Sequence, residues 1–361
     1  MSRLLLNGPI NNLSYGLVTT NILAALQAEN IDVALFPIGP VECEDVYKEN
    51  VVQALQRAQD FDFQSPCLRI FHQFSMAEKV GHDNEYFGFP IFELDTLTKL
   101  EQIHLEIPDD LFVCSHWAKK ILNNHHFGNV TVAPLGVDQR IFKPPVSKYK
   151  SPKTIFYMGG KFEKRKCHDI VVECFNKAFE TSSNVELWAA CHNPFMGTLN
   201  NIWKDYFKNS KLGSKIKIIE PVDTQAQLAY LMGQASYGIS LSRAEGWDLP
   251  LLEMMALGIP SIVSNVTAHT EFANNDNSFL VEMPEKELAQ DEYFFKPGPV
   301  NQGNWASITE SVKDDIISKI RLVHRMYQQD QLAEKSAECL KTANKFTWAN
   351  TARTLVSHIF D

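Results

Sequence analysis

Two glutamates eight positions apart, Glu245 and Glu253, stand on either side of a turn and the start of a short helix. The expected helix begins near Leu249-Pro250 and ends at Gly258-Ile259-Pro260, which is the usual placement of proline just inside a helix start and glycine just past its end. A helix N-terminus offers free backbone N–H groups and favours a phosphate. Carboxylates beside it can accept hydrogen bonds from neutral hydroxyls. Segment 244–264 therefore predicts a binding site for a nucleotide sugar, which has hydroxyls on both sides of its diphosphate.

The segment Glu-Gly-Trp-Asp-Leu-Pro-Leu-Leu-Glu-Met-Met-Ala-Leu-Gly-Ile-Pro, residues 245–260, resembles the Glu-x7-Glu signature of retaining GT-B glycosyltransferases, in particular those of glycosyltransferase family 4. The resemblance implies an α/β fold with two doubly wound, Rossmann-like domains that face a central cleft, and a C-terminal helix that crosses back to the first domain. It also implies transfer of a hexose from a nucleotide-diphosphate sugar to a hydroxyl acceptor, with retention of configuration and without a metal or other cofactor. The similarity covers residues 111–361 well and the first 110 residues weakly.

The resemblance implies a role for each part of this segment. Glu245, a candidate catalytic residue, would hydrogen-bond the hydroxyls of the donor sugar, and Glu253 would hold the ribose hydroxyls. The diphosphate would lie against Gly246, Trp247, Asp248 and Leu249. Relatives commonly carry glycine where this chain has Asp248, and a carboxylate near a diphosphate is unfavourable, so we expect Asp248 to face a sugar hydroxyl or solvent. The alternative reading is an ordinary amphipathic helix with Glu253 on its solvent face.

A second group of candidates follows the strand expected at Thr154–Met158. Gly160 lets the backbone approach a ligand closely, and Lys161 and Lys166 are spaced to flank a diphosphate. Relatives carry Gly-Arg-x4-Lys-Gly at this place, so Lys161 stands where the arginine is, Lys166 matches the lysine, and Cys167 replaces the last glycine. Because lysine supplies charge without the bidentate fork of arginine, we expect looser diphosphate binding. Exposed loop lysines without a ligand are the alternative.

Three further candidates lie in the first half of the chain. Gly16 closes a loop between the first strand and helix, and this loop resembles the family's glycine-containing loop near the donor phosphate; the Gly-x-Gly-x-x-Gly pattern of dinucleotide sites is absent. His72 and Glu93 lie where relatives contact the transferred sugar or the acceptor, and both are candidate catalytic residues. Glu93 stands between Phe89 and Phe92, a combination suited to sugar rings. Purely structural roles for these residues stay open.

The sequence does not predict a metal site, because no His/Cys/Asp spacing suggests one. Asp60-Phe61-Asp62 fits the Asp-x-Asp of metal-dependent GT-A transferases, but that fold would not use the segment from Glu245 to Glu253. Two carboxylates also suggest a glycosidase. The helix N-terminus beside them, which is suited to bind a phosphate, argues against a glycosidase. Cations and N–H groups can stabilise a departing diphosphate without a general acid.

Composition limits the functional classes. The 361 residues suit two domains, and 45% hydrophobic with 21% charged residues are typical of a soluble globular protein. No apolar run approaches the roughly 20 residues of a membrane span, and the first residues do not form an apolar stretch of the length expected in a signal peptide. Seven dispersed cysteines without Cys-x-x-Cys indicate reduced thiols and a cytoplasmic location.

Most of the net charge of −9 falls on residues 1–144, which carry 10 basic and 18 acidic residues. An acidic first half disfavours nucleic acid and anionic lipid as partners, since binding to either depends on Lys and Arg. We therefore expect a neutral glycan or small molecule as acceptor and no nucleic acid. Peripheral membrane contact has no support in the sequence.

Strands and helices alternate along the chain, which predicts parallel sheets with helices on both faces. We expect an acceptor-side domain at 1–145, a linker rich in Pro and Lys at 146–153, a nucleotide-sugar domain at 154–340, and a helix at 341–361 that packs back on the first domain. Residues 284–305 are expected to be irregular, and Gln331–Phe360 to be helical.

Two other functions fit the same features. A nucleotide-sugar epimerase or a phosphorylase would keep the fold and change the reaction. A catalytically inactive relative that only binds sugar nucleotides is the other alternative, and the departures at Lys161, Cys167 and Asp248 support it. The sequence identifies neither the sugar, nor the base, nor the acceptor.

Overall fold

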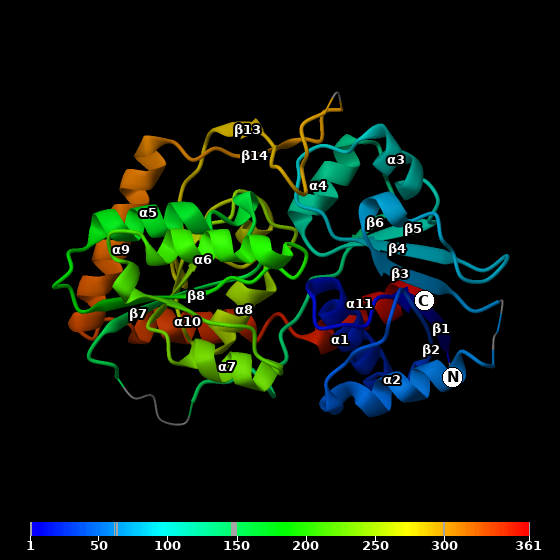
Figure 1. The fold of residues 1–361 in the computed structure, drawn as a ribbon. Coiled ribbons are helices and arrows are strands. Elements are labelled where there is room, and N and C mark those ends of the chain that lie inside the picture. Colours follow the sequence, from blue (N-terminus) through cyan, green and yellow to red (C-terminus); the bar gives the residue numbers. More distant parts are fainter. Residues whose placement is uncertain (1, 61, 63, 146–149, 299, 361) are drawn as a thin grey trace. The chain divides into compact units, whose positions relative to one another are not determined.

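The computed structural model describes residues 2–60, 62, 64–145, 150–298 and 300–360. Packing divides the chain into two compact units, each an α/β domain (Figure 1). Unit 1 comprises Met1–Asp138, Pro299–Gly303 and Lys345–Asp361, and unit 2 comprises Gln139–Gly298 and Asn304–Asn344. Half of the predicted linker, 146–149, lies outside the described residues, and the predicted domain boundaries stay predictions.

Unit 1 is built on a parallel six-stranded sheet with the order β2-β1-β3-β4-β5-β6. Its apolar strands, such as the fully buried Leu4-Leu5-Leu6, are covered on both faces by helices. The strands are β1 (Arg3–Gly8), β2 (Asp32–Pro37), β3 (Cys67–Phe71), β4 (Tyr86–Pro90), β5 (Asp110–Val113) and β6 (Val130–Val132). The helices are α1 (Ser14–Ala28), α2 (Asp45–Arg57), α3 (Lys99–Leu105), α4 (His116–Asn124) and α11 (Trp348–Phe360), with the 3-10 turn η1 (Gln73–Ser75).

Unit 2 has a second parallel six-stranded sheet, with the order β12-β11-β10-β7-β8-β9. Its strands are β7 (Thr154–Gly159), β8 (Val185–Ala190), β9 (Ile216–Ile218), β10 (Tyr237–Ser240), β11 (Ser261–Ser264) and β12 (Ser278–Val281). Its helices are α5 (His168–Ala178), α6 (Asn200–Lys208), α7 (Gln225–Gly233), α8 (Leu249–Ala256), α9 (Glu310–Gln328) and α10 (Ala333–Ala343). Strand order reverses between β7 and β10, and such a switch point is where open α/β sheets bind ligands. The predicted fold class of two doubly wound α/β domains is confirmed.

Several elements were not predicted from the sequence. Strand β4 contains Gly88 and ends in Pro90, residues that weaken a strand signal, yet it occupies the centre of its sheet between β3 and β5. Helix α3 is short, but Thr98 and Glu101 form a complete capping box that marks its start. Helix α6 was also missed.

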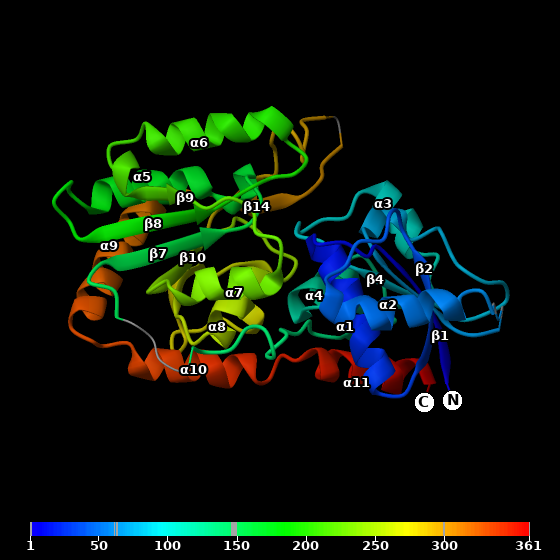
Figure 2. The same cartoon turned by 60° about the horizontal axis from the view of Figure 1, so that its bottom comes forward.

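The C-terminal third differs from expectation in two places. Part of 284–305 is ordered, because β13 (Lys286–Leu288) pairs antiparallel with β14 (Asn304–Ala306). The stretch Gln331–Phe360, expected to be helical, forms two helices, α10 and α11, separated where Thr347 forms a bridge with Val137. Helix α11 lies beside α1, so the last helix packs on the first unit as expected (Figure 2).

The start of α11 lies directly against the segment that follows β6. A Cβ placed on Gly136 would lie 2.1 Å from the backbone nitrogen of Trp348, and nearby the Thr351 hydroxyl donates to the carbonyl of Pro134 at 2.5 Å. The close approach therefore requires glycine at position 136.

We expect Gly136→Ala to lower the free energy of unfolding of unit 1 by about 1–3 kcal/mol or more, because backbone must move to admit the methyl group. Urea unfolding followed by circular dichroism measures this. Gly128→Ala is the matched control, since nothing lies within 4 Å of the position of its Cβ. Equal urea midpoints for the two variants would contradict the prediction.

Candidate functional site

The candidate site of unit 2 lies where β7 and β10 end, at the switch point of the sheet. The loop after β7 carries Lys161 and Lys166, and the loop after β10 carries Glu245. A backbone hydrogen bond from Arg243 N to Arg165 O, 2.8 Å long, joins the two loops. The sheet thus brings together two predicted groups that are about 80 residues apart in sequence.

The loop after β7 contains two residues with left-handed backbone. Gly160 has φ +106°, and the position of its absent Cβ is 3.5 Å from Cε of Lys166, so the lysine stem lies over it. Cys167 has φ +56° and opens helix α5. Left-handed backbone favours glycine, which explains why relatives carry glycine where this chain has Cys167.

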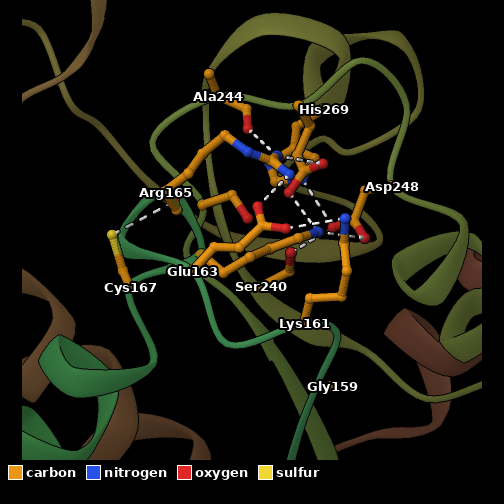
Figure 3. A network of polar contacts seen from close by, with 12 residues as sticks. Gly159, Lys161, Glu163, Arg165, Cys167, Ser240, Ala244, Asp248 and His269 are labelled. Carbon is orange, nitrogen blue, oxygen red and sulfur yellow. Dashed lines mark hydrogen bonds and ion pairs between the residues drawn. The ribbon is translucent and has the colours of Figure 1, made fainter. Parts of the chain in front are cut away.

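Ion pairs of alternating sign connect the two loops (Figure 3). Lys161 Nζ lies 3.0 Å from a Glu163 oxygen, and the other oxygen of Glu163 lies 2.9 Å from Nη2 of Arg165. Nη1 of Arg165 lies 2.9 Å from one oxygen of Glu245, whose other oxygen is 2.5 Å from Nζ of Lys166. The side chains of Arg165 and Glu245 are each only 6% exposed. Glu245 is therefore a buried carboxylate held between two cations.

The series of ion pairs continues from Lys166 to Asp248 and His269. Lys166 Nζ lies 3.9 Å from Asp248, and the other oxygen of Asp248 lies 2.9 Å from Nε2 of His269 and also accepts a hydrogen bond from Ser240. The Asp248 side chain is 2% exposed, so the expectation of a solvent-facing carboxylate is wrong. Asp248 has φ +81° at the N-cap of α8, which explains the glycine of relatives at this position.

Within this series of ion pairs, the charge of each residue shifts the pKa of its neighbours. Burial opposes ionisation of Glu245, but Arg165 and Lys166 overcome it and hold the pKa of Glu245 below its usual range. Burial also disfavours a charged Lys166, but Glu245 and Asp248 raise the pKa of this lysine above its ordinary value. Glu163 is buried as well, yet Arg165 and Lys161 lower its pKa to about 2. Each of these buried residues is thus kept ionised by neighbours of opposite charge.

Glu253 differs from the other carboxylates of the site. It lies on α8 and is buried, so the alternative of a solvent-facing residue is wrong. Burial, followed by the negative charge of Asp248, raises the pKa of Glu253 to about 8. The predicted ribose ligand is therefore a neutral carboxylic acid at pH 7.

The other predicted donor contacts lie around the start of α8. The helix begins at Leu249, as predicted, and Gly258 with φ +69° follows its end. Trp247 is buried, and its ring centroid is 5.1 Å from that of Phe272. Gly246 is buried in the same turn. The indole of Trp247 is thus a core side chain, which leaves only its backbone for the predicted contact.

Glu245, Asp248 and His269 offer ligand atoms that all lie within 4.8 Å of one another, a spacing that a metal ion could use. The donor set fits a divalent ion poorly, however, because Arg165 and Lys166 already lie against Glu245 and would repel it. The expectation of no metal stays a prediction.

The candidates of unit 1 gather around Tyr15. The ring centroid of His72 is 4.5 Å from that of Tyr15, whose hydroxyl donates to the carbonyl of Ile91, two residues before Glu93. Gly16 lies inside the first turn of α1 rather than in the preceding loop, and a Cβ there would lie 2.2 Å from Asn11 O. Its lack of a side chain thus has a packing role.

Glu93 is half-buried in the loop after β4. Phe89 and Phe92 are buried in the core, with 0% and 2% exposure. The expectation that these two rings could stack on a sugar is therefore wrong, because their faces are covered by protein. The Asp-x-Asp match at Asp60-Phe61-Asp62 includes Phe61, which lies outside the described residues.

Three members of this series of ion pairs, Glu163, Arg165 and His269, were not predicted as site residues. Arg165 lies between two matched positions, Lys161 and Lys166, and its sequence signal was the cluster of basic residues there. His269 had no local signal, because it comes from the turn η5 (Thr267–Glu271) after β11 and reaches Asp248 only through the fold.

Comparisons with known proteins agree with this architecture. Residues 152–291 match the family model described as Glycosyl transferases group 1. A search of curated proteins finds no significant match. These comparisons support the GT-B architecture of the chain.

Several solved structures share the fold over nearly the whole chain. Sucrose-phosphate synthase from Thermosynechococcus elongatus has a TM-score of 0.70 at 13% identity, over 99% of this chain and 98% of that one. Anabaena HepE in complex with UDP-glucose has a TM-score of 0.69 at 12% identity, over 99% of both chains. A glycosyltransferase from Rickettsia africae has a TM-score of 0.68 at 15% identity, over 99% and 97%.

We expect Arg165→Met to lower the free energy of unfolding by about 3–5 kcal/mol, because Glu163 and Glu245 lose the cation they share while they stay buried. Urea unfolding at pH 7 measures the change. Lys164→Met is the control, since Lys164 is the exposed neighbour on the same turn. A variant within about 1 kcal/mol of the wild type would contradict a structural role for the ion pairs.

We expect Glu253→Gln to gain stability relative to the wild type as the pH rises from 5 to 8. The wild-type carboxyl has its pKa raised from 4.5 to about 8 in the folded state. Between these values the folded state binds a proton that the unfolded state lacks, so raising the pH lowers the free energy of unfolding. Glutamine has no such proton to lose. Urea midpoints at pH 5, 6.5 and 8 give the comparison, and a constant difference between the two proteins would disprove the raised pKa.

Proposed function

We propose that the protein is a retaining, metal-independent glycosyltransferase that moves a hexose from a nucleotide-diphosphate sugar to a hydroxyl of a glycan. The observation that supports this most is Glu245, a buried, ionised carboxylate held by Arg165 and Lys166 at the switch point of unit 2. Because its charge is kept without access to bulk water, Glu245 is a strong acceptor for hydroxyl groups of a bound sugar.

In the proposed arrangement, Glu245 binds hydroxyls of the transferred sugar and Glu253 binds those of the ribose. The diphosphate lies at the start of α8, against backbone amides of residues 247–249, with Lys161 and Lys166 on its other side. These cations and the helix N-terminus stabilise the negative charge of the departing nucleoside diphosphate. Lysines thereby supply the charge that a metal ion supplies in other transferases.

The proposed reaction takes place on one face of the sugar. The bond from the anomeric carbon to the phosphate oxygen breaks, and a bond from the same carbon to the acceptor oxygen forms on the same side. The leaving phosphate takes the proton of the acceptor hydroxyl, so no separate general base is needed. His72 and Glu93 of unit 1 are the candidates for contacts with the acceptor.

The donors seen with similar structures indicate which nucleotide sugars to test, and the cysteines bear on the location. Anabaena HepE is seen with UDP-glucose, and pneumococcal GtfA with UDP and GlcNAc, so UDP-sugars are the first donors to test. No helix among the described residues is long and apolar enough to cross a membrane. The seven cysteines are free thiols, which supports the proposed cytoplasmic location.

We expect the wild-type protein to release UDP or GDP when it is incubated with UDP-glucose, UDP-GlcNAc or GDP-mannose, with unchanged rates in EDTA. Glu245→Gln should lower this release by about 100-fold or more, because hydroxyl binding by a carboxylate is lost in the transition state. Nucleoside diphosphate release is the measurement. Glu180→Gln, which removes an exposed carboxylate of the same unit, is the control.

Other results of this experiment would contradict the proposal or indicate another function. Near-normal release by folded Glu245→Gln would contradict the proposed role of Glu245. Conversion of the sugar without release of the nucleotide would indicate an epimerase. Thermal stabilisation of the wild type by UDP or GDP without any turnover would indicate an inactive relative. Loss of activity in EDTA would contradict metal independence.

A further inference from the structure

Every basic side chain that the proposed donor site offers to a diphosphate is already opposed by a carboxylate. Lys161 lies against Glu163, and Lys166 lies between Glu245 and Asp248. A diphosphate that binds Lys166 must therefore compete with two carboxylates for this lysine. One of these, Glu245, has a proposed use in sugar binding, but the side chain of Asp248 has none.

Asp248 is fixed in its place near Lys166. One of its oxygens accepts hydrogen bonds from the Ser240 hydroxyl and from Nε2 of His269, at 2.9 Å from the latter. The other oxygen faces Lys166 at 3.9 Å. The carboxylate is ionised, since Lys166 and His269 outweigh the effect of burial and hold its pKa well below the usual range. It therefore presents a permanent negative charge to the lysine.

The contacts of His269 hold the carboxylate of Asp248 in its position near Lys166. Nδ1 of the ring lies 2.8 Å from the carbonyl oxygen of Ser264, while the hydroxyl of Ser264 donates to Ser242 O. Nδ1 therefore lies against a carbonyl oxygen, and Nε2 lies 2.9 Å from the carboxylate of Asp248. These two contacts hold the fully buried ring of His269, in the turn η5, in one orientation, and the ring thereby anchors Asp248.

We propose that the side chain of Asp248 weakens the hold of the site on the diphosphate of a nucleotide, and so promotes release of the nucleoside diphosphate product. The inference rests on the proposed function, because it takes Lys166 as a ligand of the diphosphate. The carboxylate competes with the phosphates for Lys166, and it repels them directly. At 2% exposure this repulsion is little screened by water.

The backbone of Asp248 provides a clean variant. At φ +81° glycine is the residue with the least strain, so Asp248→Gly removes the carboxylate without adding backbone strain. Asp248→Asn is the second variant, because asparagine also tolerates left-handed backbone and keeps the size of the side chain. Glu220→Gln is the control for a general change of charge, since Glu220 is an exposed carboxylate of the same unit.

The experiment measures binding of UDP and GDP, and of uridine and guanosine, by isothermal titration calorimetry with the whole protein. We expect Asp248→Gly and Asp248→Asn to bind the nucleoside diphosphate on the order of tenfold more tightly than the wild type, because one buried negative charge is removed. Binding of the phosphate-free nucleoside should stay unchanged. Inhibition by added product should become stronger in the same proportion.

Unchanged or weaker binding of UDP and GDP by both folded variants would overturn the proposal. An equal gain for nucleoside and nucleoside diphosphate would also overturn it, because the effect would then not involve the phosphates. Failure of the wild type to bind either diphosphate would instead overturn the proposed function. Thermal unfolding of the variants shows whether a weaker binder is merely unfolded.

Discussion

The alternation of buried charges around Arg165 and Glu245 is the interaction on which the rest of the site depends. Taking such ions out of water costs several kcal/mol each, so their presence is tolerable only because each has a partner of opposite sign. The pairing joins the loop after β7 to the loop after β10, and this fixes Glu245 as an ion at the switch point of the sheet. Binding and stability are therefore linked in the same few side chains.

Much of the fold could be predicted from local patterns. Buried parallel strands appear as short apolar runs, which is why the strand expected at Thr154–Met158 was found, as β7 (Thr154–Gly159). Strand β4 was missed because Gly88 and Pro90 hide its pattern, although its place between β3 and β5 is set by the sheet as a whole. Local propensity cannot reveal a strand whose support comes from its neighbours.

The site was predictable in its residue types but not in its pairings. The spacing of Lys161, Lys166, Glu245 and Glu253 identified residues that the sheet of unit 2 gathers at one edge. The role of Arg165 as the shared cation and the contact of His269 with Asp248 depend on distances across the fold, which sequence spacing does not contain. The departures from the family pattern at Cys167 and Asp248 became understandable only with their left-handed backbone.

Unit 1 is built from segments at both ends of the sequence, and this has a consequence for how the chain folds during synthesis. Helix α11 packs on α1, and its first residues lie against Gly136, yet all of unit 2 lies between these partners in the sequence. During synthesis, the ribosome must therefore complete unit 2 before unit 1 can receive its last helix. Until then the N-terminal sheet lacks part of its apolar cover, so the later domain is the first that can finish folding.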